Sequence, residues 1–162
     1  MTPEQRYLFD VSGFLHLPNA LSEEELKNAQ EAVERVVRNP KEEMPPGFAK
    51  IDDNGGCSNG FAFDKALETL AMHPVSWPII KEVTGGRPRL NRGSLVVQRY
   101  QADAKISQLH CAREDCGRHT RHYEVSDGRI FCNDFIVIVY FTDVCSDDGG
   151  YSGSSWLAQG PV

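Results

Sequence analysis

The feature that most constrains the fold is an apolar run, FIVIVYF, at residues 135–141. It lies within the segment 129–144 (RIFCNDFIVIVYFTDV), and a segment of similar character, RGSLVVQRY, occupies 92–100. β-Branched and aromatic residues favour strands, and the run is much too short to span a membrane. Because a buried strand needs neighbouring strands, the chain is predicted to contain a sheet.

Residues 1–86 have a different character, since they carry the start and stop signals of helices. Thr2-Pro3-Glu4-Gln5 places a capping residue, a proline at the first helical position and a glutamine that closes a capping box. Gly13 is expected to end this helix. Ser22 and Glu25 form the capping box of a second helix, which Asn39-Pro40 should stop.

The second helix has one apolar stripe, which we interpret as core packing. Leu26, Ala29, Val33 and then Val36 or Val37 recur at helical spacing along it. Asp64 is predicted to cap a third helix that reaches about Met72. A fourth is predicted from about Val75 to Thr84, ending at Gly85-Gly86, with Phe63 and Trp77 as core anchors.

The remaining segments are predicted to be a short strand and two connections. FLHLP, at 14–18, alternates like a strand, and His16 within it is expected to be a partly buried structural histidine. Residues 40–60 contain Pro45-Pro46-Gly47 and Asn54-Gly55-Gly56, which indicate a long loop. Residues 101–128 form a polar connection between the two strand-rich segments. Helices followed by strands predict an α+β fold.

Composition limits the function. The 162 residues suffice for one domain with a core, and the net charge of −6 argues against a nucleic-acid partner. The N-terminus has no basic region followed by an apolar run, so no secretory signal is expected. No apolar stretch approaches the length of a membrane span, so no membrane partner is expected. Five cysteines, an odd number, then suggest reduced thiols in a cytoplasmic setting.

The polar connection carries a cluster of possible metal ligands, QLHCAREDCGRHTRHYEV, at 108–125. Zinc would use Cys111, Cys116, His119 and His122, but only two residues separate the cysteine pair from the histidine pair, which is too few for a usual structural site. Non-haem iron needs two imidazoles and one carboxylate, with positions left open for a cosubstrate and dioxygen. His110, after a predicted strand and a turn, suits such a site. A solvated loop without metal is the remaining interpretation.

Several segments, taken in order, resemble the phytanoyl-CoA dioxygenase family of Fe(II)/2-oxoglutarate-dependent oxygenases. The segments are GFLHLPNALSEEEL (13–26), GGRPRLNRGSLVVQRY (85–100), LHCARE (109–114) and NDFIVIVYFTDVCSDDGG (133–150). The resemblance implies N-terminal helices followed by a double-stranded β-helix of the jelly-roll or cupin type, here incomplete. It also implies Fe(II) as cofactor, 2-oxoglutarate as cosubstrate and a small hydrophobic or acyl substrate.

The resemblance assigns roles to a few residues and also shows departures. His110 would be a metal ligand. The usual H-x-D motif is His110-Cys111-Ala112 here, so Glu114 or, alternatively, Asp115 would have to supply the carboxylate. The alanine also leaves open a halogenase, in which halide fills the carboxylate position. Gln98, Tyr100 and Asn133 are candidates for the cosubstrate pocket, with ordinary sheet or turn roles as the alternative. No histidine follows His122 and no arginine follows Arg129, although the family places its second histidine and its 2-oxoglutarate-binding arginine there.

Residues 1–150 are therefore interpreted as the first part of one such domain, and 151–162 as an irregular tail. Codons can be chosen for SSWLAQ (154–159) that spell Pro-Pro-Gly-Ser-His-Lys in the neighbouring frame, which would supply the family's second histidine motif. We hypothesise that the tail is translated out of frame, so a peroxisomal signal cannot be judged from it. A genuine short isoform is the alternative.

Three functions follow from these observations. The first is an oxygenase, although this 162-residue chain is expected to be too incomplete to be active. Its FIVIVYF strand is expected to be exposed, which would lower its solubility. The second is a non-catalytic binding protein that keeps half of the fold. The third is a small zinc module.

Overall fold

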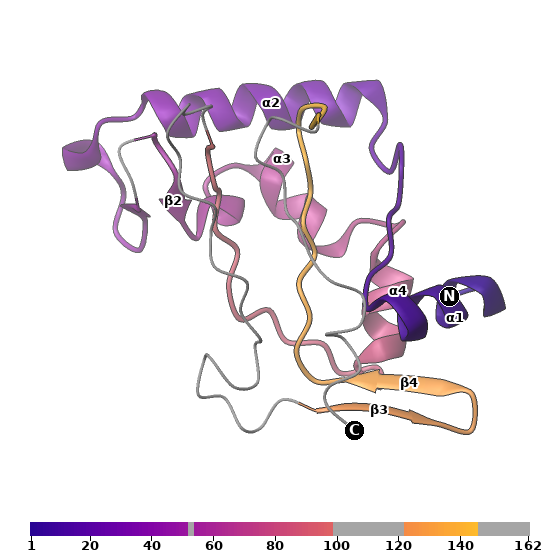
Figure 1. The fold of residues 1–162 in the computed structure, drawn as a ribbon. Coiled ribbons are helices and arrows are strands. Elements are labelled where there is room, and N and C mark those ends of the chain that lie inside the picture. The colour runs from indigo at the N-terminus through magenta and orange to yellow at the C-terminus, as the bar shows by residue number, and fades with distance from the viewer. Residues whose placement is uncertain (52–53, 99–121, 146–162) are drawn as a thin grey trace.

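The computed structural model describes residues 1–51, 54–98 and 122–145. The chain begins with helices and continues into extended segments (Figure 1). Helix α1 spans Pro3–Ser12 and α2 spans Glu23–Arg38. Both begin with the predicted capping boxes, and α1 ends at Gly13 in the left-handed conformation (φ 76°). The predicted starts of both helices and the end of α1 are therefore confirmed. They could be predicted because capping depends on residues within one turn of the helix end.

A set of short elements follows α2. The predicted long loop contains a 3₁₀ turn, η1 (Lys41–Glu43), and two short antiparallel strands, β1 (Ala49–Lys50) and β2 (Cys57–Ser58). Next come η2 (Gly60–Ala62), α3 (Lys65–Glu68) and η3 (Thr69–Met72), and α3 is capped by Asp64 as predicted. Helix α4 spans Trp77–Val83 and is followed by Gly85 and Gly86, both at positive φ.

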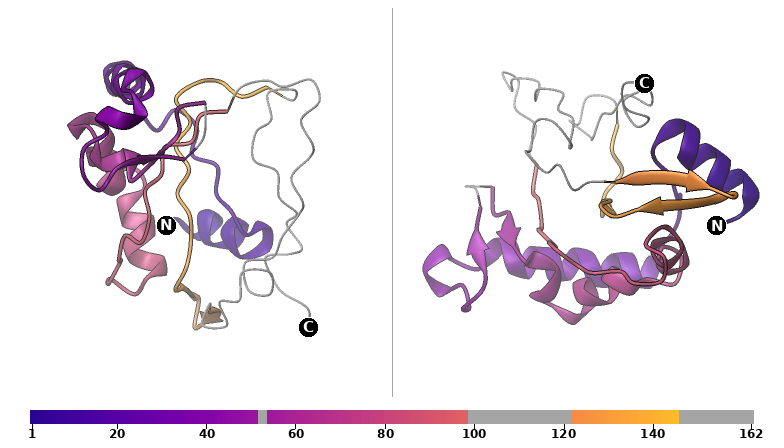
Figure 2. Two further views of the ribbon diagram at one scale, coloured as in Figure 1. Left: turned by 90° about the vertical axis from the view of Figure 1, so that its left-hand side faces the viewer. Right: turned by 90° about the horizontal axis from the view of Figure 1, so that it is seen from below.

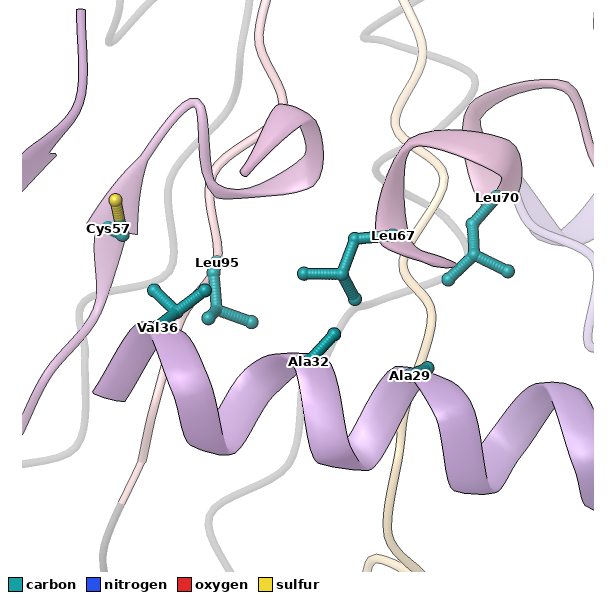
Figure 3. Close-up of a cluster of buried hydrophobic side chains, with 7 residues drawn as sticks. All are labelled: Ala29, Ala32, Val36, Cys57, Leu67, Leu70 and Leu95. Carbon is teal, nitrogen blue, oxygen red and sulfur yellow. The ribbon is translucent and has the colours of Figure 1, made fainter. Parts of the chain in front are cut away.

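The core lies between α2 and the short elements packed on it (Figure 3). Ala29, Ala32 and Val36 are fully buried on one face of α2. Ala29 and Val36 belong to the predicted apolar stripe, whereas its members Leu26 and Val33 are only partly buried. Ala32 was not predicted. Leu67 and Leu70 point toward the two alanines, while Cys57 and Leu95 lie beside Val36. Small residues on α2 therefore let α3 and η3 approach the helix closely.

Two strand predictions are wrong within the described residues. Residues 14–17 form no strand, and His16 is exposed rather than partly buried. The expected strand at 92–100 is reduced, over residues 92–98, to one isolated bridge in which Leu95 pairs with Cys57. A lone strand has no partner for its N–H and C=O groups, so an apolar sequence alone does not produce one.

The expected strand at 129–144 is much shorter than predicted. Strands β3 (Tyr123–Ser126) and β4 (Arg129–Cys132) form an antiparallel hairpin, and β3 lies in the segment expected to be a polar connection. The turn residues Asp127 and Gly128 both have positive φ, as a two-residue hairpin turn requires. Beyond β4, residues 135–141 pair with no strand in the described part of the chain.

The described elements are helices and antiparallel strand pairs, so the α+β class is confirmed. Figure 2 shows the β3–β4 hairpin beside α1, with α2 and the short helices in a separate layer. The segments 87–98 and 133–145 run through the molecule as extended chain (Figures 1 and 2). Val97, Val139 and Phe141 from these segments pack against the core cluster. The double-stranded β-helix stays a prediction.

Candidate functional site

Some of the predicted site residues belong to the described part of the chain, and others lie outside it. His110, Glu114 and Tyr100 lie outside the described residues, as do Cys111, Cys116 and His119 of the zinc interpretation. Gln98 and Asn133 are described, and His122 begins the segment that follows. The structure therefore shows the two flanks of the predicted metal-binding segment. The first flank is the described chain up to residue 98, and the second is residues 122–145.

Gln98 ends the first flank and is exposed. Leu95 is buried, Val96 is 61% exposed, Val97 is partly buried against the core and Gln98 is exposed again. This alternation is that of extended chain with one face on the helices. Gln98 therefore lies on the face opposite the α2 core.

Asn133, in the second flank, forms hydrogen bonds with His122. The Asn133 N–H donates to the His122 carbonyl at 3.1 Å, and the His122 N–H donates to Asn133 Oδ1 at 2.7 Å. The pair joins the two chain ends of the β3–β4 hairpin. This is a turn-type role, which the sequence had left as the alternative to cosubstrate binding.

The His122 side chain interacts with its own hairpin. Its Nε2 lies 3.0 Å from Glu124 Oε2, and both side chains are more than half exposed. Its ring lies 6.1 Å from the Phe131 ring, centroid to centroid, in a tilted arrangement. An exposed pair of this kind contributes little to stability but keeps the imidazole at the hairpin surface.

A polar contact that the sequence analysis missed fixes the hairpin to α1. The Tyr123 hydroxyl donates to Asp10 Oδ1 at 2.8 Å, and the Tyr123 ring lies 6.4 Å from that of Phe9. Burial, with the neighbouring Asp10 carboxylate, raises the pKa of Tyr123 well above its usual range. The partners are far apart in the sequence, so no local pattern could have paired them.

The second extended segment is joined to α2 by one side chain. Gln30 Nε2 donates to the Phe141 carbonyl at 2.6 Å, while Val139 and Phe141 pack against the core. Ile138 and Tyr140, on either side of Val139 in the sequence, are about half exposed, and Ile136 is 77% exposed. Over residues 138–141 the segment thus contacts the helices with alternate residues and presents apolar side chains on its other face.

Within the described ranges, no group of three or more His, Cys, Asp or Glu side chains is placed to hold a metal ion. Cys57 carries a fully buried thiol whose pKa is raised by burial, which makes it unreactive as a nucleophile. The described part of the chain contains the sequence flanks of the predicted metal-binding segment, and the predicted ligands His110 and Glu114 lie outside it.

In the same part of the chain, no helix has the length and apolar character needed to cross a membrane. Searches against protein-family models, curated proteins and solved structures found no match to this chain.

Proposed function

We propose that this chain is the first portion of an Fe(II)/2-oxoglutarate-dependent dioxygenase of the phytanoyl-CoA dioxygenase type, with a small hydrophobic or acyl substrate. The proposal rests on the resemblance of segments 13–26, 85–100, 109–114 and 133–150 in this order. The observation that carries it in the structure is the placement of the two flanks. Both 95–97 and 139–141 pack against the same α2 core cluster.

That placement suits a sandwich with helices on its outer face. The two flanks contribute alternate apolar residues to the helix layer, and their other face carries Gln98 on one segment and Ile136 and Ile138 on the other. In a jelly roll this second face would be the interior that holds the metal and the substrate. The double-stranded β-helix is part of the proposal, and further strands would cover this face.

His110 and Glu114 would hold the iron in this proposal, since one imidazole and one carboxylate belong to the usual ligand set. Iron held there would supply, with 2-oxoglutarate and dioxygen, the oxidation of a substrate C–H bond with release of succinate and CO₂. Gln98 and Tyr100 would line the cosubstrate pocket. Asn133 would contribute by fixing the end of the metal-binding segment through His122.

Metal titration tests the proposal on the chain itself. Fe(II) is added without oxygen, in the presence of 2-oxoglutarate, and bound iron is measured by elemental analysis after equilibrium dialysis. Weak binding is expected because few ligands converge, and His110→Ala should abolish it. His122→Ala is the matched control and should leave it unchanged, because the His122 ring pairs with Glu124. Iron uptake independent of His110 would contradict the proposal.

The same titration with zinc distinguishes the other interpretations. Tight zinc binding lost in Cys116→Ala or His119→Ala would identify a zinc module. A non-catalytic binding protein would bind neither metal, and the exposed apolar residues at 136–140 favour this candidate over zinc.

The coding DNA for residues 145–162 tests the tail hypothesis separately. We expect the neighbouring frame to spell Gly-Ser-His near residues 155–159 and to continue to an arginine. Codons that cannot encode this motif would exclude the frame hypothesis, while the metal titration would still decide the oxygenase proposal.

A further inference from the structure

Three exposed arginines lie in one short connection after α4. Residues 87–92 read Arg-Pro-Arg-Leu-Asn-Arg, and Arg87, Arg89 and Arg92 are all exposed. We call residues 87–92 the arginine loop. Leu90 within it is 58% exposed, so the loop does not fold its apolar residue into the core.

The arginine loop is fixed at both ends. On its N-terminal side, Gly86 N–H donates to the Lys81 carbonyl at 2.7 Å and Arg87 N–H donates to the Thr84 carbonyl at 3.3 Å. On its C-terminal side, Phe61 N–H donates to the Gly93 carbonyl at 3.1 Å. A Cβ atom at Gly93 would lie 2.0 Å from the Phe61 ring, so only glycine permits this close approach.

The loop arginines also differ from the arginines of the helices. Arg6, Arg35 and Arg38 each pair with a carboxylate, at 2.5–2.6 Å. Within residues 1–51, 54–98 and 122–145, no carboxylate pairs with a loop arginine. In a chain of net charge −6, the loop is therefore a concentration of positive charge that is not neutralised by these residues.

We propose that the arginine loop binds a small multivalent phosphate anion, such as a diphosphate group. A guanidinium presents a planar fork of donors that matches phosphate oxygens, and two forks in one short loop can contact the same anion. The Cα atoms of Arg87 and Arg89 lie within about 7 Å of each other, because two residues of chain reach no further. Pro88 restricts the backbone between them, which lowers the entropy lost on binding.

The charge balance of the chain favours a small anion over a polymer. A diphosphate would touch only the arginine loop. A nucleic acid or an anionic membrane would also approach the acidic remainder of the protein, where it would be repelled. The proposed site uses none of the proposed iron ligands and does not depend on the proposed function.

Calorimetric titration of the 162-residue chain with pyrophosphate at low ionic strength tests this site. The triple variant Arg87→Ala, Arg89→Ala, Arg92→Ala should weaken binding by about tenfold or more, as expected for the loss of several charge-assisted hydrogen bonds. The matched control Lys27→Ala, Arg38→Ala, Lys41→Ala removes the same charge from exposed positions on and beside α2 and should leave the affinity within about twofold. Far-UV circular dichroism verifies that both variants are folded.

A second variant separates geometry from charge. Replacing the three arginines by lysine keeps the charge but removes the planar forks, so an intermediate loss is expected. The proposal is overturned if wild type does not bind pyrophosphate, or if the control variant loses as much affinity as the alanine variant. Tighter binding of hexaglutamate or of a short single-stranded oligonucleotide than of pyrophosphate would also overturn it, because the partner would then be a polymer.

Discussion

The helical region, residues 1–86, and the extended region, described over 87–98 and 122–145, contain similar kinds of apolar residue but use them differently. In α2, Ala29, Ala32 and Val36 are fully buried. In the extended region, Ile136 is 77% exposed and Val96 is 61% exposed. A helix satisfies its backbone hydrogen bonds within one segment, whereas a strand depends on partners elsewhere. The helical region therefore folds on local signals, and the extended region is only as buried as its partners allow.

The largest expected effect tests this contrast directly. Leu67→Ala, in α3, should lower the free energy of unfolding by about 2–5 kcal/mol, because Leu67 is 4% exposed and packs against α2. Ile136→Ala is the matched change in the extended region and should cost less than about 0.5 kcal/mol. Urea denaturation followed by circular dichroism measures both. Equal losses would mean that residues 135–141 are buried in solution, and the contrast would fail.

A smaller effect should come from the helix cap. Ser22→Ala should lower the free energy of unfolding by about 1 kcal/mol. The Ser22 hydroxyl accepts a hydrogen bond from the Glu25 N–H at 3.3 Å, an N–H group at the helix N-terminus that has no partner within the helix. Ser76, at the N-cap of α4, makes no such side-chain bond to its helix, so Ser76→Ala should cost less. The same denaturation experiment compares the two. A Ser22→Ala loss no greater than that of Ser76→Ala would show that tertiary packing, and not the cap, fixes the start of α2.

The contact between the regions predicts an effect of similar or smaller size. Tyr123→Phe removes the hydrogen bond to Asp10 that joins β3 to α1, at a cost of about 0.5–1.5 kcal/mol. Because the folded-state pKa of Tyr123 is raised, this stability is present below the normal tyrosine pKa and is lost as the pH rises through the folded value. Ultraviolet titration of the phenols should show one late-titrating tyrosine that is absent from the variant. Normal titration of all tyrosines in the wild type would contradict the contact.

The sequence predicted the helical region well because its signals are local. The capping residues Thr2, Ser22 and Asp64 all act within one turn of the helices that they start. The strands were predicted less well, because the sequence of a run such as 135–141 does not determine which other segment it pairs with. One local signal was overlooked: Asp127-Gly128 is a typical hairpin turn, and it would have placed β3 inside the connection that was expected to be polar coil.

The candidate site was predicted from ligand chemistry and resemblance. The structure adds a description of the residues that precede and follow the predicted metal-binding segment in the sequence. The contact of Asn133 with His122 depends on the hairpin register, which composition does not reveal. Gln98 was a candidate for the cosubstrate pocket, and the alternate burial of residues 95–98 leaves its side chain exposed on the face opposite the α2 core. Its role in cosubstrate binding stays a prediction.

The smallest expected effect is a pH dependence within the helical region. Arg35 donates to Asp64 Oδ2 at 2.6 Å, and the Ala66 N–H donates to Asp64 Oδ1 at 3.0 Å. The Arg35 guanidinium, together with that N–H, lowers the pKa of Asp64. A lowered folded-state pKa gives stability that is present above the unfolded pKa of about 3.9 and is lost as the pH falls through the folded value.

Asp64→Asn separates the charge from the cap, because asparagine also caps helices well. At neutral pH the variant should lose no more than about 1 kcal/mol, since Arg35 is half exposed and the pair is screened by solvent. Denaturant titrations between about pH 6 and pH 2 should show a shallower acid-induced loss of stability for the variant than for the wild type. Parallel pH profiles would mean that Asp64 acts only as a cap, and the start of α3 would then be determined by hydrogen bonding without any contribution from its charge.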